Sequence, residues 1–543
     1  MSEPAGEHTV DVVVVGAGFA GLYLTYRLTR LGMRVLTLEQ GDDVGGTWYW
    51  NRYPGARCDA ESLAYSFSFS EEMEQEWQWS ERYATQPEIL RYARHVADRF
   101  ELRQHIRFEQ TVNAVHWQGD HWQVATTAGL NLTARFCFLA TGCLSVPQLP
   151  DIPGLDRFAG ERYQASLWPH AGVDFSNKRV GQIGTGSSGI QAAPVIAAQA
   201  ASLTVFQRTP NFSVPAENGV LDEHWVSQFK QHYREHRQQH RLGLSSGFGD
   251  LEIKPVPRTP AAATAVGLSD QQVADILDPF WARGGAFFMG AFEDTLINPE
   301  SNQRVADYVR AKIRATVRDP VTAAALCPQD HPIGSKRICV DTGYYETFNR
   351  DNVALVDVAA DPIQTITETG LQTRSGTVYE FDALVLATGF DAMTGALLRM
   401  DVQGRDGVRL QDQWQAGPSS YLGLAMADFP NLFMITGPGS PSVLSNMLVS
   451  IEQHVDWTVA LLEHMRAREL QQVEASAEAQ AAWTAHVDDI AQSTLFPRGG
   501  SWYLGANVAG KARVFMPYAA GVGAYREHCD EVADDNYRGF EFT

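Results

Sequence analysis

Two segments of the chain repeat one order of apolar and polar positions. An apolar run at residues 12–15 leads into a glycine-rich turn, a segment with helical spacing and a second apolar run at 34–38. The same order starts again at the apolar run 179–183 and ends near residue 208. Short apolar runs bounded by turn residues indicate buried strands, and wider spacing indicates a helix. We therefore predict two βαβ units, over about residues 10–40 and 178–208, each opening a Rossmann-type domain.

Each predicted unit is matched further along the chain by an apolar strand that ends in Ala-Thr-Gly. These strands occupy residues 136–142 and 383–389. A terminal glycine lets the chain pass close to a bound dinucleotide because it has no Cβ. After a single strand, Ala-Thr-Gly is equally compatible with an ordinary turn, but its recurrence at matching places favours a domain signature.

The turn of each unit carries a GxGxxG motif, GAGFAG at residues 16–21 and GTGSSG at 184–189. One such motif alone is weak evidence, but here each has a strand before it and a helix after it. The glycines let the backbone approach a pyrophosphate, whose charge meets the N-terminus of the helix. The predicted cofactor-binding residues of the turns are Gly16, Gly18, Gly21, Gly184, Thr185, Gly186, Ser187, Ser188 and Gly189.

The residue 23 positions after the first glycine distinguishes the two units. In the first unit it is Glu39, a carboxylate that can accept hydrogen bonds from ribose hydroxyls. In the second it is Gln207, followed by Arg208 and Thr209, and an arginine here pairs with a 2′-phosphate. The first site thus suits FAD or NAD and the second NADP. The chain is expected to be a flavoprotein that receives electrons from NADPH.

Composition narrows the class of protein, its partners and its location. Of 543 residues, 44% are hydrophobic and 20% charged, as in folded globular proteins, and the formal net charge of −21 argues against a nucleic-acid partner. Residues 1–8 lack the features of a signal peptide, and no apolar stretch is long enough to span a membrane. The six cysteines form no CxxC pair, which favours ordinary thiols in a reducing compartment, the cytoplasm, and no metal site.

The predicted fold is α/β, with two Rossmann-like dinucleotide-binding domains, for FAD and NADP, and a helical insertion. The insertion is indicated by charged, helix-favouring runs such as 225–237 and by scarce strand patterns. A strand at 431–437 returns the chain to the first domain. The expected division is 1–145 (FAD, first part), 146–215 (NADP, first part), 216–330 (insertion), 331–389 (NADP, second part) and 390–543 (FAD, second part, with a C-terminal loop).

Several longer segments resemble type I Baeyer–Villiger monooxygenases, most closely the phenylacetone and cyclohexanone enzymes. They are GGTWYWNRYPGARCDAES at 45–62, SKRICVDTGYYETFNRDNV at 335–353 and TGPGSPSVLSNM at 436–447. The family signature FxGxxxHxxxW(P/D) is matched from Phe158 to Pro169, except that Gln164 replaces the histidine. Glutamine can exchange hydrogen bonds but cannot take up a proton near neutral pH, so it can substitute only for a structural role. Trp168-Pro169 favours this family over the flavin-containing monooxygenases.

The resemblance implies a reaction and residues that carry it out. NADPH reduces FAD, O₂ gives a C4a-peroxyflavin, and this oxidant converts a small hydrophobic ketone to an ester or lactone, with sulfoxidation as a side activity. By matched position, Arg337 is the catalytic cation and Asp59 holds it, while Lys336 joins Arg208 at the 2′-phosphate and Trp502 lies on a loop over NADP. The implied substrate-pocket residues are Ser442, Val443 and Leu444, and further FAD contacts are Gly46, Thr47, Trp48, Tyr65, Val112 and Met447.

Two other functions remain open at this point. One is a flavin-containing monooxygenase that oxidises nitrogen or sulfur nucleophiles, against which Trp168-Pro169 and Arg337 argue. The other is a non-catalytic nucleotide-binding protein or flavin sensor, for which Gln164 is the one supporting feature. The sequence leaves ketone size, selectivity and oligomeric state undetermined.

Overall fold

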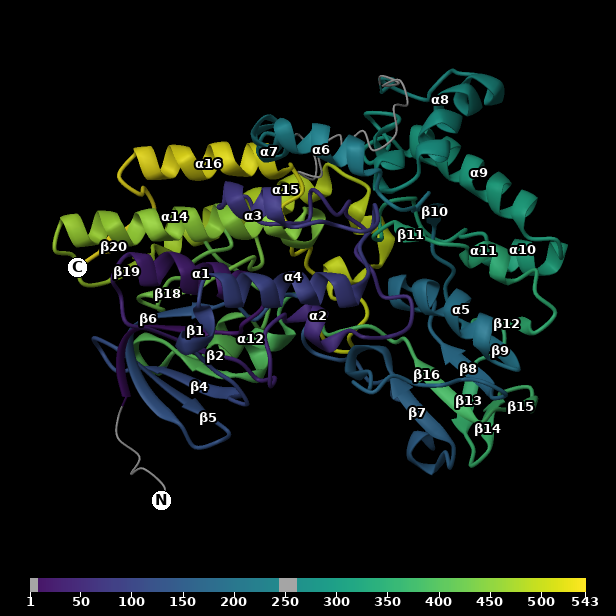
Figure 1. Ribbon diagram of the computed structural model, residues 1–543, viewed down its shortest axis with the longest axis horizontal. Coiled ribbons are helices and arrows are strands. Elements are labelled where there is room, and N and C mark those ends of the chain that lie inside the picture. The colour runs from purple at the N-terminus through teal and green to yellow at the C-terminus, as the bar shows by residue number, and fades with distance from the viewer. Residues whose placement is uncertain (1–7, 244–260) are drawn as a thin grey trace.

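The computed structural model describes residues 8–243 and 261–543, and it contains two separate Rossmann-type sheets (Figure 1). The α/β fold predicted from the repeated pattern is therefore confirmed. The interpretation of residues 1–8 concerns a segment that, apart from the backbone of His8, lies outside the described residues.

The first sheet is built around the N-terminal strand, which pairs in parallel with strands on both sides. Its central strands are continuous apolar runs because both faces are covered. In spatial order the strands are β17 (Asp401–Gln403), β4 (Val112–Trp117), β5 (Trp122–Thr126), β6 (Asn131–Leu139), β1 (His8–Val15), β2 (Val35–Leu38) and β3 (Ile106–Arg107), with β18 (Leu432–Met434) also paired to β6. The last part of the chain thus returns to this sheet through β17 and β18, as the sequence predicted for the strand near 431–437.

The second sheet is entirely parallel and has five strands. Their spatial order is β12 (Val353–Asp357), β9 (Ser202–Gln207), β8 (Arg179–Ile183), β16 (Ala383–Leu386) and β7 (Glu161–Gln164). Smaller sheets are formed by β13 (Ile363–Ile366), β14 (Gly370–Thr373) and β15 (Val378–Glu380), by β10 (Ser213–Pro215) with β11 (Cys339–Asp341), and by β19 (Val473–Ala475) with β20 (Phe540–Phe542).

Helices cover the two sheets and the space between them (Figure 1). In the first unit α1 packs along α14, and in the second α5 packs on β8 and β9. Around the first sheet lie α1 (Phe19–Arg30), α2 (Thr47–Trp50), α3 (Glu71–Glu76), α4 (Gln86–Arg99), α12 (Gly395–Arg399), α13 (Leu410–Gln413), α14 (Met447–Ala467), α15 (Ala477–Gln492) and α16 (Val522–Asp534). Around the second lie α5 (Ser187–Gln199), α8 (Asp270–Arg283), α9 (Pro299–Thr316), α10 (Pro320–Leu326) and α11 (Tyr344–Thr347).

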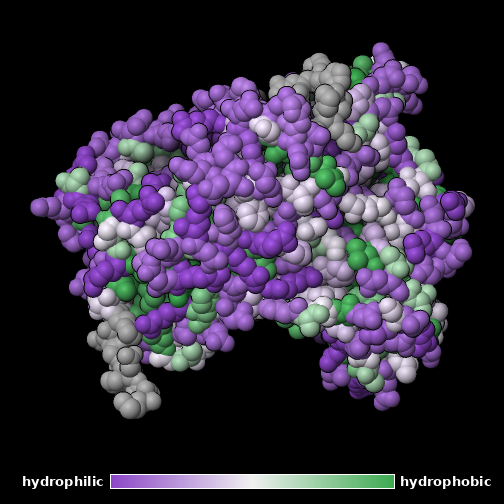
Figure 2. Space-filling model, viewed as in Figure 1, coloured by the Kyte–Doolittle hydropathy of each residue, from purple (hydrophilic) through white to green (hydrophobic). Residues whose placement is uncertain are grey.

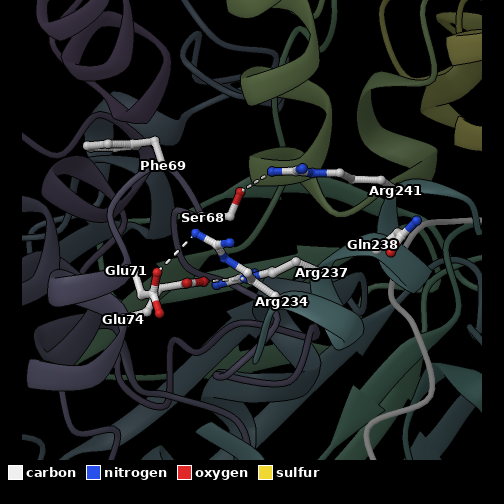
Figure 3. A pocket seen from close by; sticks show the side chains of 8 residues that line it. All are labelled: Ser68, Phe69, Glu71, Glu74, Arg234, Arg237, Gln238 and Arg241. Atoms are coloured by element: carbon white, nitrogen blue, oxygen red, sulfur yellow. Dashed lines mark hydrogen bonds and ion pairs between the residues drawn. The ribbon is translucent and has the colours of Figure 1, made fainter. Parts of the chain in front are cut away.

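The helices predicted for the insertion divide between two hydrophobic cores. α6 (Glu223–Gln231) and α7 (Tyr233–Arg241) pack against the core of the first sheet, whereas α8 and α9 pack against the core of the second. Glu74 on α3 and Arg237 on α7 form a buried ion pair, with 2.8 Å between Oε1 and Nε. This pair lines a pocket of about 500 Å³, in which Figure 3 also shows the ion pair of Arg234 with Glu71 and the hydrogen bond from Arg241 to Ser68. The start of the insertion is therefore attached to the first sheet.

The face drawn in Figure 2 is mainly hydrophilic, and its outline is notched between the parts that carry the two sheets. Among the described helices, none is long and apolar enough to cross a membrane. All six cysteines are free thiols and all are buried.

Candidate functional site

The first glycine turn is closed by contacts that only glycine permits. Gly16 has φ +104°, and a Cβ there would lie 2.6 Å from the carbonyl oxygen of Ala140, in the Ala-Thr-Gly element that follows β6. A Cβ on Gly21 would lie 1.8 Å from the carbonyl oxygen of Gly16. Gly18 caps α1 without any side-chain hydrogen bond, so the first-turn N–H groups of the helix face no capping side chain. This geometry fits a dinucleotide pyrophosphate.

Glu39 lies at the end of β2 and is tied to the same turn. Its carboxylate accepts hydrogen bonds from the backbone N–H groups of Ala17 (2.7 Å) and Gly41 (2.8 Å). Burial raises the pKa of Glu39, and these two hydrogen bonds act in the opposite direction. Each carboxylate oxygen can accept a second hydrogen bond, so Glu39 remains able to bind ribose hydroxyls.

The segment 44–59 covers the first turn. A Cβ on Gly18 would lie 3.4 Å from the Cα of Gly46, which begins α2. The next residues also contact the second unit, because the Tyr53 hydroxyl donates to Oε1 of Gln191 on α5 at 2.8 Å. Gln191 in turn donates through Nε2 to the carbonyl of Arg57 at 3.1 Å. The segment therefore encloses the first turn and joins it to the helix of the second.

The second glycine turn has the same closure, but no described residue covers it at the place where Gly46 covers the first. Gly184 has φ +112°, and a Cβ there would lie 2.3 Å from the carbonyl oxygen of Ala387, in the other Ala-Thr-Gly element. A Cβ on Gly189 would lie 2.3 Å from the carbonyl oxygen of Gly184, whereas Gly186, the cap of α5, would meet nothing within 4 Å. The turn is thus open on the face where Gly46 covers the first one.

The hydroxyl groups of the second turn are largely engaged within the protein. Thr185 donates to the carbonyl of Thr209 at 2.9 Å, and the Ser187 hydroxyl lies 3.4 Å from the sulfur of Cys339. Ser188 contacts the hydroxyl of Tyr53. The Gln207 side chain is buried and donates to the carbonyl of Ala325 at 2.8 Å, so its amide nitrogen is engaged within the protein.

Lys336 and Arg208 lie near enough for the charge of one to act on the other, although the sequence separates them widely. Burial lowers the pKa of Lys336, Asp330 raises it, and the positive charge of Arg208 lowers it again. Arg208 follows β9 directly and is exposed. Arg208 precedes Thr209, whose carbonyl accepts from Thr185 of the second turn. Two cations whose charges act on one another suit a phosphate group that neutralises both.

Arg337 and Asp59 form a two-pronged ion pair. Nε of Arg337 donates to Oδ2 of Asp59 at 2.6 Å and Nη2 donates to Oδ1 at 2.8 Å, with a quarter of each side chain exposed. Burial opposes both charges, but their mutual attraction prevails, so the pKa of Asp59 is lowered and that of Arg337 is raised. The remaining nitrogen, Nη1, donates to the carbonyl of Val443 at 2.5 Å. The guanidinium is thus charged, oriented and partly accessible.

An apolar cluster lies beside this ion pair. It is formed by the loop around the short helix η6 (Ser442–Leu444), by the turn η8 (Trp502–Leu504) and by the residues after the first Ala-Thr-Gly element. Val443 is buried, whereas Leu444, Met447 and Trp502 are half-buried at its edge. The structure therefore brings together Arg337 and all three residues expected in the substrate pocket.

The other expected FAD contacts lie around the first unit. Trp48 donates from Nε1 to the hydroxyl of Tyr65 at 3.1 Å, and both are buried. Thr47 is exposed at the start of α2, while Val112 is buried in the core beside β1. Gln164 ends β7, beside β16, and its buried Nε2 has no hydrogen-bond partner among the described residues. Trp168 is buried against Tyr163 and Phe175.

Tyr503 is a site residue that sequence reasoning missed. Its side chain contacts Arg337, and burial raises the pKa of its hydroxyl to about 12 despite that neighbouring charge. Tyr503 directly follows Trp502, so the signal was adjacency to an expected loop residue. The Val443 carbonyl could not be predicted either, because any residue supplies a carbonyl.

Comparisons with known proteins agree with this geometry. The sequence profile of the family described as "Pyridine nucleotide-disulphide oxidoreductase" matches residues 13–244. The chain is 40% identical to the 2-oxo-Δ3-4,5,5-trimethylcyclopentenylacetyl-CoA monooxygenase of Pseudomonas putida, with all of both chains covered. It is also 40% identical to a Baeyer–Villiger monooxygenase of Pseudooceanicola batsensis, covering 97% of this chain and 95% of that one. A phenazine N-monooxygenase of Lysobacter antibioticus is 39% identical over 98% of this chain and 96% of its own.

Solved structures match over nearly the whole chain. An oxidised steroid monooxygenase bound to NADP superposes with a TM-score of 0.92 and 48% identity, covering 98% of this chain and 99% of that one. OTEMO in complex with FAD and NADP superposes with a TM-score of 0.92 and 38% identity, covering 99% of this chain and 100% of its own. Both cofactors predicted from the paired glycine turns are present in that structure.

Proposed function

Because the chain belongs to the Baeyer–Villiger monooxygenases, FAD-dependent enzymes that use NADPH and O₂ to convert ketones to esters or lactones, we propose that Arg337 is its catalytic cation and Asp59 positions it. The observation that carries this proposal is the two-pronged ion pair, which fixes the plane of the guanidinium while leaving part of it exposed. The pair lies beside the apolar cluster around Val443.

The chemistry of the reaction explains why a fixed cation is needed. Bound FAD, once reduced by NADPH, supplies the activated oxygen that attacks the ketone carbonyl. The attack places negative charge on the carbonyl oxygen, and a preorganised cation stabilises that charge. Arg337 is suited to this role because its raised pKa keeps it charged at every working pH. Asp59 orients it without needing to change its own protonation.

We also propose which residues hold the cofactors. For FAD the support is the closed first turn with Glu39 and its cover, and for NADPH it is the open second turn with Arg208 and Lys336. The FAD residues proposed are Gly16, Gly18, Gly21, Glu39, Gly46, Thr47, Trp48, Asp59, Tyr65, Val112 and Met447. The NADPH residues are Gly184, Thr185, Gly186, Ser187, Ser188, Gly189, Arg208, Thr209, Lys336, Arg337 and Trp502, with Thr185 and Ser187 acting through their backbone N–H groups.

The substrate proposed is a hydrophobic ketone that contacts Ser442, Val443 and Leu444. The support is the apolar character of the cluster around η6 and Trp502. The 48% identical steroid monooxygenase favours fused-ring ketones as the first compounds to test. A second candidate activity, oxidation of soft nitrogen or sulfur atoms, is favoured by the 39% identical phenazine N-monooxygenase.

We also propose a domain division, supported by the sheet pairing, and a cellular compartment, supported by the state of the cysteines. The sheet pairing supports an FAD domain from 1–145 and 390–543 and an NADP domain from 146–215 and 331–389, with α6 and α7 of the insertion held on the former. Six free, buried thiols support a reducing compartment, for which we propose the cytoplasm.

Arg337→Ala tests the proposal directly. Ketone oxygenation, measured as ester or lactone formed per NADPH, should fall by about 100-fold or more, which is the size of effect seen when one oxyanion-stabilising group is removed. Thioether oxidation by the same variant should fall much less, because no negative charge develops on a carbonyl oxygen. Val378→Ala serves as the control, because Val378 is exposed on β15 and is not part of the apolar cluster. Equal losses in both reactions would contradict the role of Arg337.

A further inference from the structure

His454 is a buried histidine that the proposed mechanism does not use. It lies on the second turn of α14, is fully buried, and accepts a hydrogen bond at Nδ1 from the backbone N–H of Thr436 at 2.9 Å. Burial lowers the pKa of His454 to about 3, with the charge of Arg526 acting in the same direction, so the ring is neutral at working pH. Because Nδ1 accepts, the ring proton is on Nε2.

The second ring nitrogen of His454 destabilises the fold. Nε2 is buried and has no hydrogen-bond partner among the described residues. A buried N–H without an acceptor destabilises the fold, and an apolar side chain of similar size would avoid that penalty. An apolar side chain would therefore fill this position better than histidine does. The hydrogen bond from Thr436 explains why a ring nitrogen is present here.

The loop that begins at Thr436 has a strained backbone. Thr436 has φ +57° and Ser442 has φ +42°, although neither is a glycine. Residues other than glycine adopt this conformation only where neighbouring contacts hold them in it. The Ser442 hydroxyl donates to the Thr436 carbonyl at 3.1 Å, and the sulfur of Cys143 lies 3.1 Å from the same hydroxyl. His454 thus fixes the N–H of Thr436 while Ser442 fixes its carbonyl.

The strained loop ends at the carbonyl that holds Arg337. Val443 directly follows Ser442, and its carbonyl accepts from Nη1 of Arg337 at 2.5 Å. The guanidinium is a rigid plane, so Asp59 and the Val443 carbonyl hold it jointly, and Tyr503 contacts it as well. A shift of this loop would therefore break the Nη1 contact or displace the guanidinium as a whole.

We propose that His454 is a positioning residue for ketone oxygenation, which acts through Thr436, Ser442 and the Val443 carbonyl on the orientation of Arg337. The inference rests on the proposed role of Arg337 in the reaction. It assigns His454 no contact with substrate or cofactor.

The chemistry of the contact defines a set of variants. The Oδ1 atom of asparagine can occupy the place of histidine Nδ1, whereas the Oε1 atom of glutamine reaches the place of Nε2. His454→Asn should therefore keep the Thr436 contact, and His454→Gln and His454→Phe should lose it. Thr458→Val is the matched control: it removes another fully buried polar group one turn along α14, whose hydroxyl donates to the carbonyl of His454 but not to the loop.

The experiment compares a cyclic ketone with a thioether as substrates of the FAD-loaded enzyme. For His454→Phe and His454→Gln we expect kcat for the ketone to fall by about tenfold to 100-fold, the loss typical of a small misplacement of a catalytic group. The thioether rate should fall much less than the ketone rate, and KM for the ketone should rise, because the same loop carries Ser442, Val443 and Leu444. His454→Asn should restore most of the ketone rate, and Thr458→Val should keep the wild-type ratio of the two rates. If His454→Phe binds no FAD, the comparison of the ketone rates of His454→Asn and His454→Gln tests the inference instead.

The inference is overturned if the ketone and thioether rates fall together, or if Asn is no better than Gln. A double variant separates this failure from failure of the proposed function. In an Arg337→Ala background, His454→Gln should have no further effect on ketone oxygenation, because residues that act through one another are not additive. If Arg337→Ala alone leaves ketone oxygenation intact, the proposed function fails. If Arg337→Ala abolishes ketone oxygenation, but His454→Gln in the otherwise wild-type enzyme leaves ketone oxygenation intact, only the role of His454 fails.

Discussion

The two βαβ units close their glycine turns in the same way but differ in what lies over them. In both, the first glycine sits against the alanine of an Ala-Thr-Gly element, with hypothetical Cβ distances of 2.6 Å at Gly16 and 2.3 Å at Gly184. Over the first turn lies Gly46, close to Gly18, whereas Gly186 has open space in front of it. A covered site suits a cofactor that stays bound through many reaction cycles, and an open site suits one that is exchanged in every cycle.

The charged residues expected to contact the two cofactors also differ between the covered first unit and the open second unit. Glu39 is buried and bound to the backbone of its own turn, whereas Arg208 is exposed and Lys336 arrives from a distant segment. The first unit is therefore complete in itself once its cover is in place. The second depends on the segment 335–337, which carries both Lys336 and the catalytic candidate Arg337.

The largest expected contrast comes from adding one methyl group at the third glycine of each motif. Gly21→Ala would place Cβ 1.8 Å from the Gly16 carbonyl oxygen, and Gly189→Ala would place it 2.3 Å from that of Gly184. We expect Gly21→Ala to be purified without flavin absorbance. Gly189→Ala should be yellow but should show no flavin reduction on mixing with NADPH in a stopped-flow instrument. A colourless Gly189→Ala protein would contradict the separation of the two units.

Glu39→Gln should weaken the first unit alone. Glutamine can accept through only one of its two terminal atoms, so one of the hydrogen bonds from Ala17 and Gly41 is lost, together with the charge that ribose hydroxyls would meet. Hydrogen bonds to charged groups contribute about 1.5–3 kcal/mol, so FAD affinity should fall by about tenfold to 100-fold. Titration of the apoprotein with FAD measures this. The dissociation constant of NADPH, followed on the FAD-saturated variant, should stay unchanged.

Arg208→Ala should change the second unit alone, by removing a cation from the 2′-phosphate. The preference for NADPH over NADH, taken as the ratio of kcat/KM values, should fall by about tenfold, which corresponds to about 1.4 kcal/mol. Lys336→Ala should act in the same direction. FAD content is the internal control, and loss of FAD from Arg208→Ala would show that the effect is not local.

The smallest expected effect is a pH dependence confined to the second unit. The pKa of Lys336 is lowered from its usual value of 10.5, so the lysine loses its charge at a lower pH than an ordinary one. Below that pKa the cation attracts the 2′-phosphate, and above it the attraction is lost. The dissociation constant of NADPH should therefore rise as the pH increases through the alkaline range, while that of NADH stays flat. A matching rise for NADH would assign the titration to another group.

The sequence predicted the parts of this comparison that depend on local pattern. Apolar runs, glycine spacing and the residue after the second strand identified both units, and the family resemblance implied the meeting of Arg337 with Asp59, which lie 278 positions apart. The direction of the Gln207 side chain was not predictable, because a buried amide can point into the protein or toward a ligand. Nor was the attachment of α6 and α7 to the first sheet, since charged helices carry little information about their partners.

Because Glu74 on α3 and Arg237 on α7 form a buried ion pair, the two helices should come from the same parent in any chimaera built from this chain and its relatives. A crossover placed between them, with a parent that lacks one partner, would leave the other charge buried and alone, at a cost of about 3–5 kcal/mol. Such a hybrid would be expected to express poorly, whatever activity its two nucleotide sites retained. Recombination should therefore transfer these helices together, although 163 positions separate the two residues.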